Sequence, residues 1–247
     1  MSGESLRPLG AVTSARLSLG LDAGAVSTQE QLRFQMDHAL ARDAVQAELD
    51  VALLMGGLRE RGLEAISLRS AVPEGRGARQ VYLRRPDLGR ALDESSRAVL
   101  VRGACDVVFV IADGLSALAV ERHALPLMDA VLVGMDREQW KMGPVCVVTQ
   151  GRVAVGDEIG LLLGSKLVVL LIGERPGLSA ADSLGVYLTW GPKVGQTDAE
   201  RNCVSNVREG GLGYVEAAGR ILFYMEGAKR LGESGIALKE SGMGLAG

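Results

Sequence analysis

Residues 166–172 read KLVVLLI, the longest of three short and almost unbroken aliphatic runs in the chain. The other two are DVVFVI at residues 106–111 and VCVVT at residues 145–149, and helix-like sequence separates each run from the next. Continuous rather than alternating apolarity indicates strands that are covered on both faces, as in the parallel sheet of an α/β domain. The runs therefore predict a Rossmann-like, doubly wound, mostly parallel sheet within residues 101–247, and residues 185–190 are a candidate fourth strand.

The first element before this sheet is a predicted helix that starts near residue 27. Ser27-Thr28-Gln29-Glu30 has the pattern of a capping box, in which the Ser27 hydroxyl accepts an orphan backbone amide and Glu30 reaches back. Apolar residues then follow at approximately helical spacing as far as Gly56-Gly57, where we expect the helix to stop. Residues 1–26 lack sustained periodicity, so we expect an extended or flexible N-terminal arm there.

A hairpin is the simplest interpretation of the next segment. Residues 64–72 and 78–83 have the composition of strands, and the turn-forming Pro73-Glu74-Gly75-Arg76-Gly77 separates them. A helix should follow from Pro86-Asp87 to about Arg102. Residues 27–100 are therefore expected to form a small helical and hairpin region ahead of the sheet.

Composition excludes several classes of protein. Of the 247 residues, 47% are hydrophobic and 23% are charged, which is typical of a globular protein. The formal net charge is −3 and no basic run concentrates positive charge, so we expect neither nucleic acid nor an anionic membrane surface as a partner. The strongest apolar stretch, at residues 167–173, is far shorter than the roughly 20 residues of a membrane-spanning helix. Met1 to Asp22 lacks the hydrophobic stretch of a secretory signal.

The cysteines and histidines offer little for metal or nucleophilic chemistry. The three cysteines are widely spaced and form no C-x-x-C, so we expect no zinc site or disulfide framework and a reducing, cytoplasmic setting. His38 and His123 are the two histidines, and neither has a motif partner nearby. We therefore predict no catalytic residue and no metal ligand.

Ligands of such sheets lie beyond the carboxyl ends of the strands, which directs attention to the loops at residues 112–116, 150–153 and 173–177. Glu174 follows a strongly apolar run, where an ionised carboxylate is costly unless something satisfies it. The sequence supports a structural role for Glu174, in a salt bridge with Arg175 or as a helix N-cap, as well as it supports ligand binding. For Asp113, helix capping is the favoured interpretation.

A dinucleotide fingerprint is missing from every predicted strand end. G-x-G-x-x-G occurs at residues 242–247, where it ends the chain and cannot open a helix. A nucleotide-dependent Rossmann-like oxidoreductase therefore remains only a weak alternative. Cys203 would by default be a buried small apolar residue.

Taken as a set, segments between about Ser27 and about Gly235 resemble the small (light) subunit of ethanolamine ammonia-lyase, an adenosylcobalamin-dependent enzyme. The matching segments are Leu32-Arg33-Phe34, Asp37-His38, Tyr82-Leu83, Arg85-Pro86-Asp87-Leu88-Gly89-Arg90, Asp113-Gly114-Leu115-Ser116, Gly151-Arg152-Val153, Gly173-Glu174-Arg175-Pro176-Gly177-Leu178, Asp198-Ala199-Glu200-Arg201-Asn202-Cys203-Val204-Ser205-Asn206, Gly210-Gly211 and Val215-Glu216-Ala217-Ala218.

The resemblance implies a chain that is inactive alone and completes the cofactor site of a larger enzyme. In the family, a large subunit with a TIM barrel binds the substrate and converts ethanolamine to acetaldehyde and ammonia by a radical mechanism, and the small subunit covers cobalamin from the other side. The family's cobalamin-binding positions carry over onto Val153, Glu174 and Cys203. Glu174 is suited to accept hydrogen bonds from corrin amide groups. A cobalamin-binding subunit of a lyase for another amino alcohol is the nearer alternative.

The resemblance also implies an assembly and a location. Family members form a hetero-oligomer, a trimer of αβ-pair dimers, with the large subunit as the partner. Many carry an N-terminal amphipathic helix that directs the enzyme into a bacterial microcompartment. Residues 1–26 show no clear helical stripe, so the chain is expected in the cytoplasm and encapsulation stays open.

Overall fold

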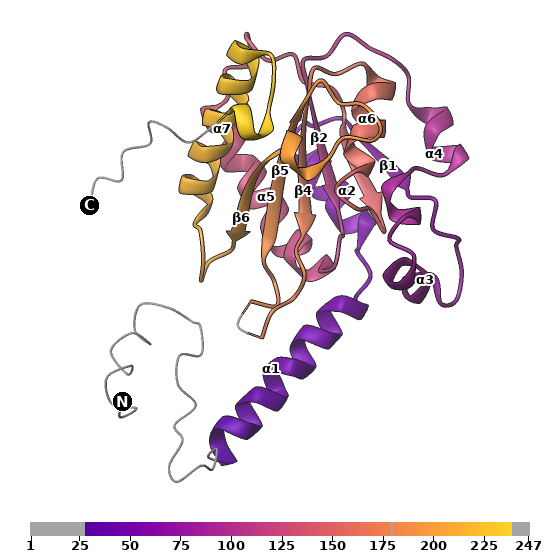
Figure 1. Ribbon diagram of the computed structural model, residues 1–247, viewed down its shortest axis with the longest axis vertical. Coiled ribbons are helices and arrows are strands. Elements are labelled where there is room, and N and C mark those ends of the chain that lie inside the picture. The colour runs from indigo at the N-terminus through magenta and orange to yellow at the C-terminus, as the bar shows by residue number, and fades with distance from the viewer. Residues whose placement is uncertain (1–27, 179, 239–247) are drawn as a thin grey trace, which may run out of the picture.

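The computed structural model describes residues 28–178 and 180–238 and has an α/β fold around one six-stranded sheet (Figure 1). The strand order is β1-β3-β2-β4-β5-β6. The strands are β1 (Ala65–Arg69), β2 (Val107–Ala112), β3 (Val145–Thr149), β4 (Leu167–Gly173), β5 (Leu184–Trp190) and β6 (Asn202–Val207). The predicted strands at residues 106–111, 145–149, 166–172 and 185–190 are thus confirmed.

The sheet is mixed, so the prediction of a mostly parallel, Rossmann-like sheet is not confirmed. β1, β3, β2 and β4 pair in parallel, whereas β5 pairs antiparallel with both β4 and β6. A parallel return to β4 would need a crossover of a dozen or more residues, usually with a helix. The connection at residues 174–183 is too short for that, so β5 runs back beside β4.

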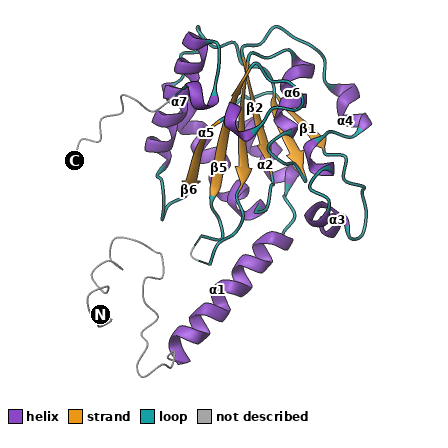
Figure 2. Ribbon diagram, in the orientation of Figure 1, coloured by secondary structure: helices purple, strands orange, loops and turns teal. Residues whose placement is uncertain are grey.

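Helices cover both faces of the sheet (Figure 2). Helices α2, α5 and α7 contribute buried side chains to one core cluster, and α6 contributes to the cluster on the opposite face. Every residue of β2 and β4 is buried, which explains why their sequences are apolar without alternation. The helices are α1 (Thr28–Gln46), α2 (Val51–Glu60), α3 (Ala78–Arg84), α4 (Glu94–Val99), α5 (Ala117–Gly134), α6 (Val155–Leu163) and α7 (Tyr214–Leu231), with 3-10 turns η2 (Leu88–Arg90), η3 (Asp198–Glu200) and η4 (Gly235–Ala237).

The predicted hairpin is wrong. Residues 78–83 belong to helix α3, and β1 pairs with β3 as an edge strand of the main sheet. Arg79 and Tyr82 are the buried residues of α3, and their spacing of three positions places both on one helical face. The buried residues of this segment, not its apolar ones, therefore recur at the period of a helix.

Two helix boundaries also differ from expectation. The first helix ends at Gln46, and α2 begins at Val51 after Asp50, whose Oδ1 accepts a hydrogen bond from the backbone N–H of Leu53 at 2.9 Å. Gly56-Gly57 lies inside α2 rather than at a helix end. α1 extends away from the sheet (Figure 1).

The single helix expected from Pro86-Asp87 to Arg102 is replaced by η2 and α4. The N-terminal arm, Ser27 of the capping box and the terminal glycine motif lie outside the described residues. Within the described part of the chain, no helix is both long and apolar enough to cross a membrane.

Candidate functional site

The loops after β2 and β4 lie against each other at the carboxyl edge of the sheet. The backbone N–H of Leu115 donates to the carbonyl of Gly173 at 2.9 Å. The loop after β4 then leads through residues 174–183 into β5, which starts at the same edge. Two of the three loops selected from the sequence are therefore joined by a direct hydrogen bond.

Glu174 is fixed with one carboxylate oxygen left open. Its Oε2 accepts hydrogen bonds from the Ser183 hydroxyl and from the backbone N–H of Asn206, the latter at 3.2 Å. Its backbone N–H donates to the Ser183 carbonyl at 2.9 Å. In the described part of the chain, Oε1 has no hydrogen-bond partner. Neither an Arg175 salt bridge nor a helix cap, the two structural roles considered from the sequence, accounts for this carboxylate.

The lack of a side chain at Gly185 leaves space for the side chain of Glu174. A Cβ atom built on Gly185 would lie 2.9 Å from Oε1 and 3.1 Å from Cγ of Glu174. Contacts under 3.0 Å are ones that real Cβ atoms essentially never show, so a larger residue at position 185 would displace the carboxylate. The glycine thus serves a close approach between β5 and the loop after β4.

Tyr187 and Cys203 continue this surface along β5 and β6. The two residues are partners in the strand register, and the Sγ of Cys203 lies 3.1 Å from Oγ of Ser205. Cys203 is exposed, so the expectation of a buried small residue is wrong. Neighbouring atoms desolvate the thiol in part, although the residue keeps an exposed surface, and this raises the pKa of Cys203. The charge of Glu174 adds to that rise. The group is therefore a neutral thiol near pH 7.

The side chains of Tyr187 and Val153 pack on the same face of the sheet, the face that α6 covers. Val153 lies in the turn before α6, and its carbonyl accepts a hydrogen bond from the backbone N–H of Gly156 at 3.2 Å. A residue of α3 holds the segment that leads into this turn. The hydroxyl of Tyr82 donates to the Gly151 carbonyl at 2.9 Å. Val153 thus packs on the α6 face, as does Tyr187, the register partner of Cys203, whereas Glu174 lies just beyond the carboxyl end of β4.

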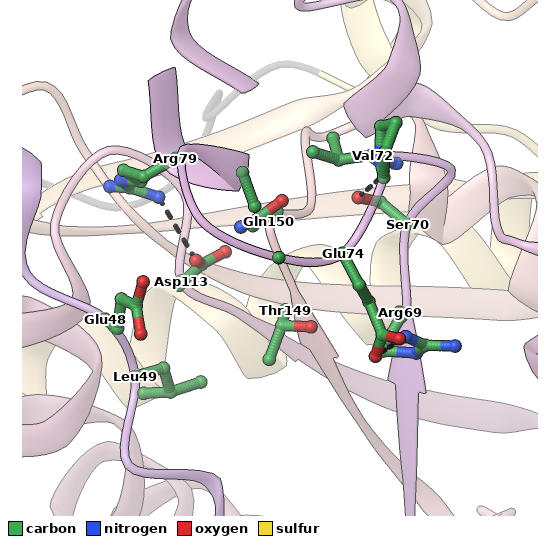
Figure 3. A pocket seen from close by; sticks show the side chains of 13 residues that line it. Glu48, Leu49, Arg69, Ser70, Val72, Glu74, Arg79, Asp113, Thr149 and Gln150 are labelled. Atoms are coloured by element: carbon green, nitrogen blue, oxygen red, sulfur yellow. Dashed lines mark hydrogen bonds and ion pairs between the residues drawn. The ribbon is translucent and has the colours of Figure 1, made fainter. Parts of the chain in front are cut away.

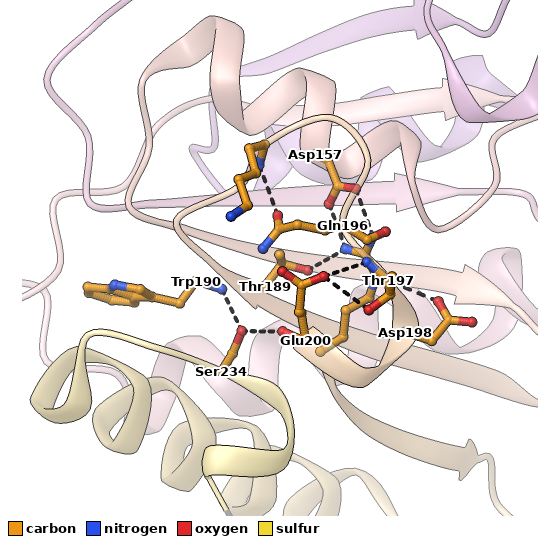
Figure 4. Close-up of polar contacts among 10 residues, drawn as sticks. Asp157, Thr189, Trp190, Gln196, Thr197, Asp198, Glu200 and Ser234 are labelled. Carbon is orange, nitrogen blue, oxygen red and sulfur yellow. Dashed lines mark hydrogen bonds and ion pairs between the residues drawn. The ribbon is translucent and has the colours of Figure 1, made fainter.

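A buried ion pair joins α6 to Arg201, the residue before β6. Arg201 donates two hydrogen bonds to Asp157, at 2.6 and 2.7 Å, and both side chains are 2% exposed. Arg201 also donates to Oγ1 of Thr189 at 2.8 Å and to the Gln196 carbonyl at 3.0 Å. Figure 4 shows Asp157, Thr189 and Gln196 gathered around these bonds. Burial raises the pKa of the Asp157 carboxyl, opposed by the Arg201 guanidinium.

Asp113 is not a helix cap. Its carboxylate accepts a hydrogen bond from the Gly151 N–H at 3.1 Å and pairs with Nη1 of Arg79 at 3.2 Å. The capping residue of α5 is Ser116, whose Oγ accepts from the Ala119 N–H at 3.2 Å. Full burial raises the pKa of Asp113 to about 6, although the Arg79 charge opposes the rise.

A pocket beside Asp113 tests the oxidoreductase alternative. It has a volume of about 270 Å³, below the roughly 300–1,000 Å³ that is usual for ligand pockets. Figure 3 shows Arg79 with Asp113 on one side of it and Arg69 with Glu74 on the other. Glu48, Glu74 and Asp113 bring three carboxylates to its lining. Arg69 and Arg79 also line the pocket, but they already pair with Glu74 and Asp113, so the described lining offers a nucleotide pyrophosphate no uncompensated positive charge. The pocket therefore disfavours that alternative.

Several supporting residues were missed from the sequence alone. Ser183 and Asn206 hold Glu174, Tyr187 adjoins Cys203, and Arg201 pairs with Asp157. Arg201 and Asn206 lie in the segment around Cys203 that resembles the family, and this resemblance was the one feature of the sequence that could have pointed to them. Ser183 and Tyr187 had none, because only the antiparallel return of β5 brings them to Glu174 and Cys203.

A family model and individual relatives place the chain in the same family. Residues 3–239 match the family model described as ethanolamine ammonia-lyase light chain. A protein of Pseudomonas aeruginosa strain LESB58 named ethanolamine ammonia-lyase small subunit is 51% identical over 239 residues, which cover 94% of this chain and 86% of that protein. Proteins of the same name from Azotobacter vinelandii and Ralstonia nicotianae are each 50% identical, over 235 and 236 residues, and each alignment covers 93% of this chain and 86% of the relative. The chain therefore belongs to the ethanolamine ammonia-lyase light-chain family.

Proposed function

We propose that this chain is the small subunit of an adenosylcobalamin-dependent ethanolamine ammonia-lyase. In this role it completes the cobalamin site at the interface with a catalytic large subunit, which converts ethanolamine to acetaldehyde and ammonia. Residues 101–247 would cover the cofactor, since Val153, Glu174 and Cys203 all lie there. The observation that carries the proposal is the open Oε1 of Glu174, held at the sheet edge by Ser183 and Asn206.

The residues present fit the chemistry of a corrin ring. The rim of the ring carries amide groups, whose N–H donors need acceptors. Oε1 of Glu174 is such an acceptor, because Ser183 and Asn206 engage only Oε2. Val153 is half-buried and Cys203 exposed, so both have surface left for an apolar macrocycle. The neutral thiol of Cys203 adds no charge to this surface.

In such a complex the tasks of this chain are binding, orientation and exclusion of water. Adenosylcobalamin, when bound, supplies radical chemistry through homolysis of its cobalt–carbon bond. Glu174 fixes the orientation of the ring by a charge-assisted hydrogen bond. The apolar side chain of Val153 and the face of Tyr187 would close the site against solvent on this side. No acid or base on this chain is assigned a proton transfer.

Assembly and location follow from the same proposal. The large subunit is the expected partner, in a trimer of αβ-pair dimers. The described cysteines, Cys105, Cys146 and Cys203, are free thiols, which supports a reducing compartment such as the cytoplasm. Placement inside a bacterial microcompartment would depend on residues 1–26.

Co-purification tests the function directly. The chain and an ethanolamine ammonia-lyase large subunit, co-expressed with a tag on one of them, should elute together. The complex should bind adenosylcobalamin, seen in its visible spectrum, and should release ammonia from ethanolamine, whereas this chain alone should not. A large subunit that is fully active and retains the cofactor equally well without this chain would refute the proposal.

A further inference from the structure

A second pocket lies on the other side of the loop that carries Glu174, between α5 and the start of α7. Its volume is about 470 Å³, within the usual range of ligand sites. Its lining residues with polar or charged side chains are Arg122, His123, Asp182, Arg208, Glu209 and Tyr214. None of these residues has a role in the proposed cobalamin site.

His123 carries a buried nitrogen that lacks a hydrogen bond. The residue is 4% exposed, and its Nδ1 lies 2.8 Å from the hydroxyl of Tyr214. Within the described residues, its Nε2 is buried and has no hydrogen-bond partner, and the nearest carboxylate oxygen, of Asp182, is 3.4 Å away. A buried polar atom without a partner is costly. When Nδ1 accepts from the Tyr214 hydroxyl, Nε2 carries the ring proton and can donate it to a ligand oxygen.

Two arginines, Arg122 and Arg208, line the same pocket together with the carboxylates of Asp182 and Glu209. Asp182 is neutralised by Arg122, whose Nη1 donates to it at 2.8 Å. Within the described residues, Nε of Arg208 donates to Oδ1 of Asn206 at 3.0 Å, and its two Nη groups make no hydrogen bond.

The start of α7 adds further donors. This helix of 18 residues begins at Tyr214, and its N-cap, Gly213, makes no side-chain capping hydrogen bond. The first backbone N–H groups of a helix have no partner within the helix, and the macrodipole favours an anion beside them. With the buried His123 nitrogen, the pocket thus combines three kinds of donor.

We propose that this pocket binds a phosphate-type oxyanion, with His123 Nε2, Arg208 and the amino end of α7 as its donors. A tetrahedral oxyanion has enough acceptor oxygens to satisfy all three at once. The site faces α5 and α7, whereas Tyr187 and Val153 pack on the α6 face, so it is separate from the proposed cofactor surface. It is linked to that surface through Asp182, the residue before Ser183, whose hydroxyl holds Glu174.

Histidine resonances give a direct test on the full-length chain. The chain has two histidines, so His38, which is remote in sequence and exposed, serves as an internal reference. Titration with inorganic phosphate at constant ionic strength should move the His123 ring nitrogen signals saturably, with a dissociation constant of roughly 1 mM or tighter. The His38 signals should not follow. Shifts of both histidines in proportion, or no saturable shift, would overturn the proposal.

Matched variants separate a built site from general charge attraction. Arg208→Gln should weaken phosphate binding at least about tenfold, as measured by calorimetry. Arg137→Gln removes the same charge from an exposed position outside the pocket and should leave the affinity unchanged. His123→Gln, measured in parallel, should also lower the affinity, so the test survives if one variant fails to fold. Equal affinity in wild type and in a folded Arg208→Gln or His123→Gln variant would refute the site.

Discussion

Asp157 of α6 and Arg201, the residue before β6, form a bidentate ion pair in the interior of the protein. Asp157 follows Val153 by one helical turn, and Arg201 precedes Cys203 by two residues on the same segment. The pair therefore sets how the turn before α6 lies relative to the outer strand. We infer that it positions two of the three proposed cofactor contacts without touching the cofactor.

Removing one partner of this pair should be severe. Arg201→Leu leaves Asp157 as an uncompensated buried charge, which is expected to lower the free energy of unfolding by about 3–5 kcal/mol. Urea unfolding followed by circular dichroism measures this. Arg85→Gln breaks an exposed pair with Asp87 and should have no measurable effect. The double variant with Asp157→Leu should recover part of the loss, and a single variant as stable as wild type would contradict the role of the pair.

Gly185→Ala should displace the Glu174 carboxylate without a change to Glu174 itself. The new Cβ would lie 2.9 Å from Oε1, so the carboxylate must move, and the complex should bind adenosylcobalamin more weakly. Gly56→Ala is the control, because nothing lies within 4 Å of a Cβ there and the residue is helical. That change should leave cofactor binding intact and stabilise α2 by about 0.5–1 kcal/mol. Equal cofactor affinity in the two variants would argue against the proposed position of Glu174.

Cys203 should react slowly until it is deprotonated. Because crowding and the charge of Glu174 raise the pKa of its thiol, alkylation by iodoacetamide should be slow at pH 7 and should accelerate steadily above pH 9. Mass spectrometry of the modified peptide gives the rate. In the assembled complex, bound cobalamin should protect the thiol from the reagent. Unchanged labelling on addition of cofactor would place Cys203 outside the site.

Asp113 predicts a pH dependence of stability. Its pKa of about 6 in the folded chain lies above the ordinary 3.8, so the folded state binds the proton more tightly than the unfolded state. This contribution is present at low pH and is lost as pH rises through about 4 to 6. Relative to Asp113→Asn, the wild-type chain should lose more than about 1 kcal/mol of unfolding free energy over this window. A constant difference between the two proteins from pH 4 to 6.5, measured by urea unfolding, would contradict this.

The central strands could be predicted because their environment leaves a simple signature. β2 and β4 are buried on both faces, and only uninterrupted aliphatic sequence meets that condition. β6 was not predicted, since it is an edge strand whose residues Cys203, Ser205 and Asn206 are exposed. The direction of β5 could not be predicted either, because its apolar sequence is compatible with both parallel and antiparallel pairing.

The site could be predicted in part. Glu174 stood out as a carboxylate after an apolar strand, and resemblance added Val153 and Cys203. The hydroxyl of Ser183 and the backbone amide of Asn206 could not be assigned to Glu174, because a backbone donor carries no sequence signal and both contacts depend on how β5 and β6 return. Local sequence thus singled out the Glu174 carboxylate, which stays a predicted acceptor, and only the fold shows what holds it.

The central claim is that Glu174 of this chain contacts the cobalamin that the large subunit also binds. Its most direct test is titration of the assembled complex with adenosylcobalamin, followed by visible absorbance, for wild type, Glu174→Gln and the exposed control Glu233→Gln. Loss of a hydrogen bond to a charged acceptor costs about 1.5–3 kcal/mol, so Glu174→Gln should weaken binding roughly 10- to 100-fold. Glu233→Gln should match wild type. An unchanged cofactor affinity in a correctly assembled Glu174→Gln complex would contradict the claim.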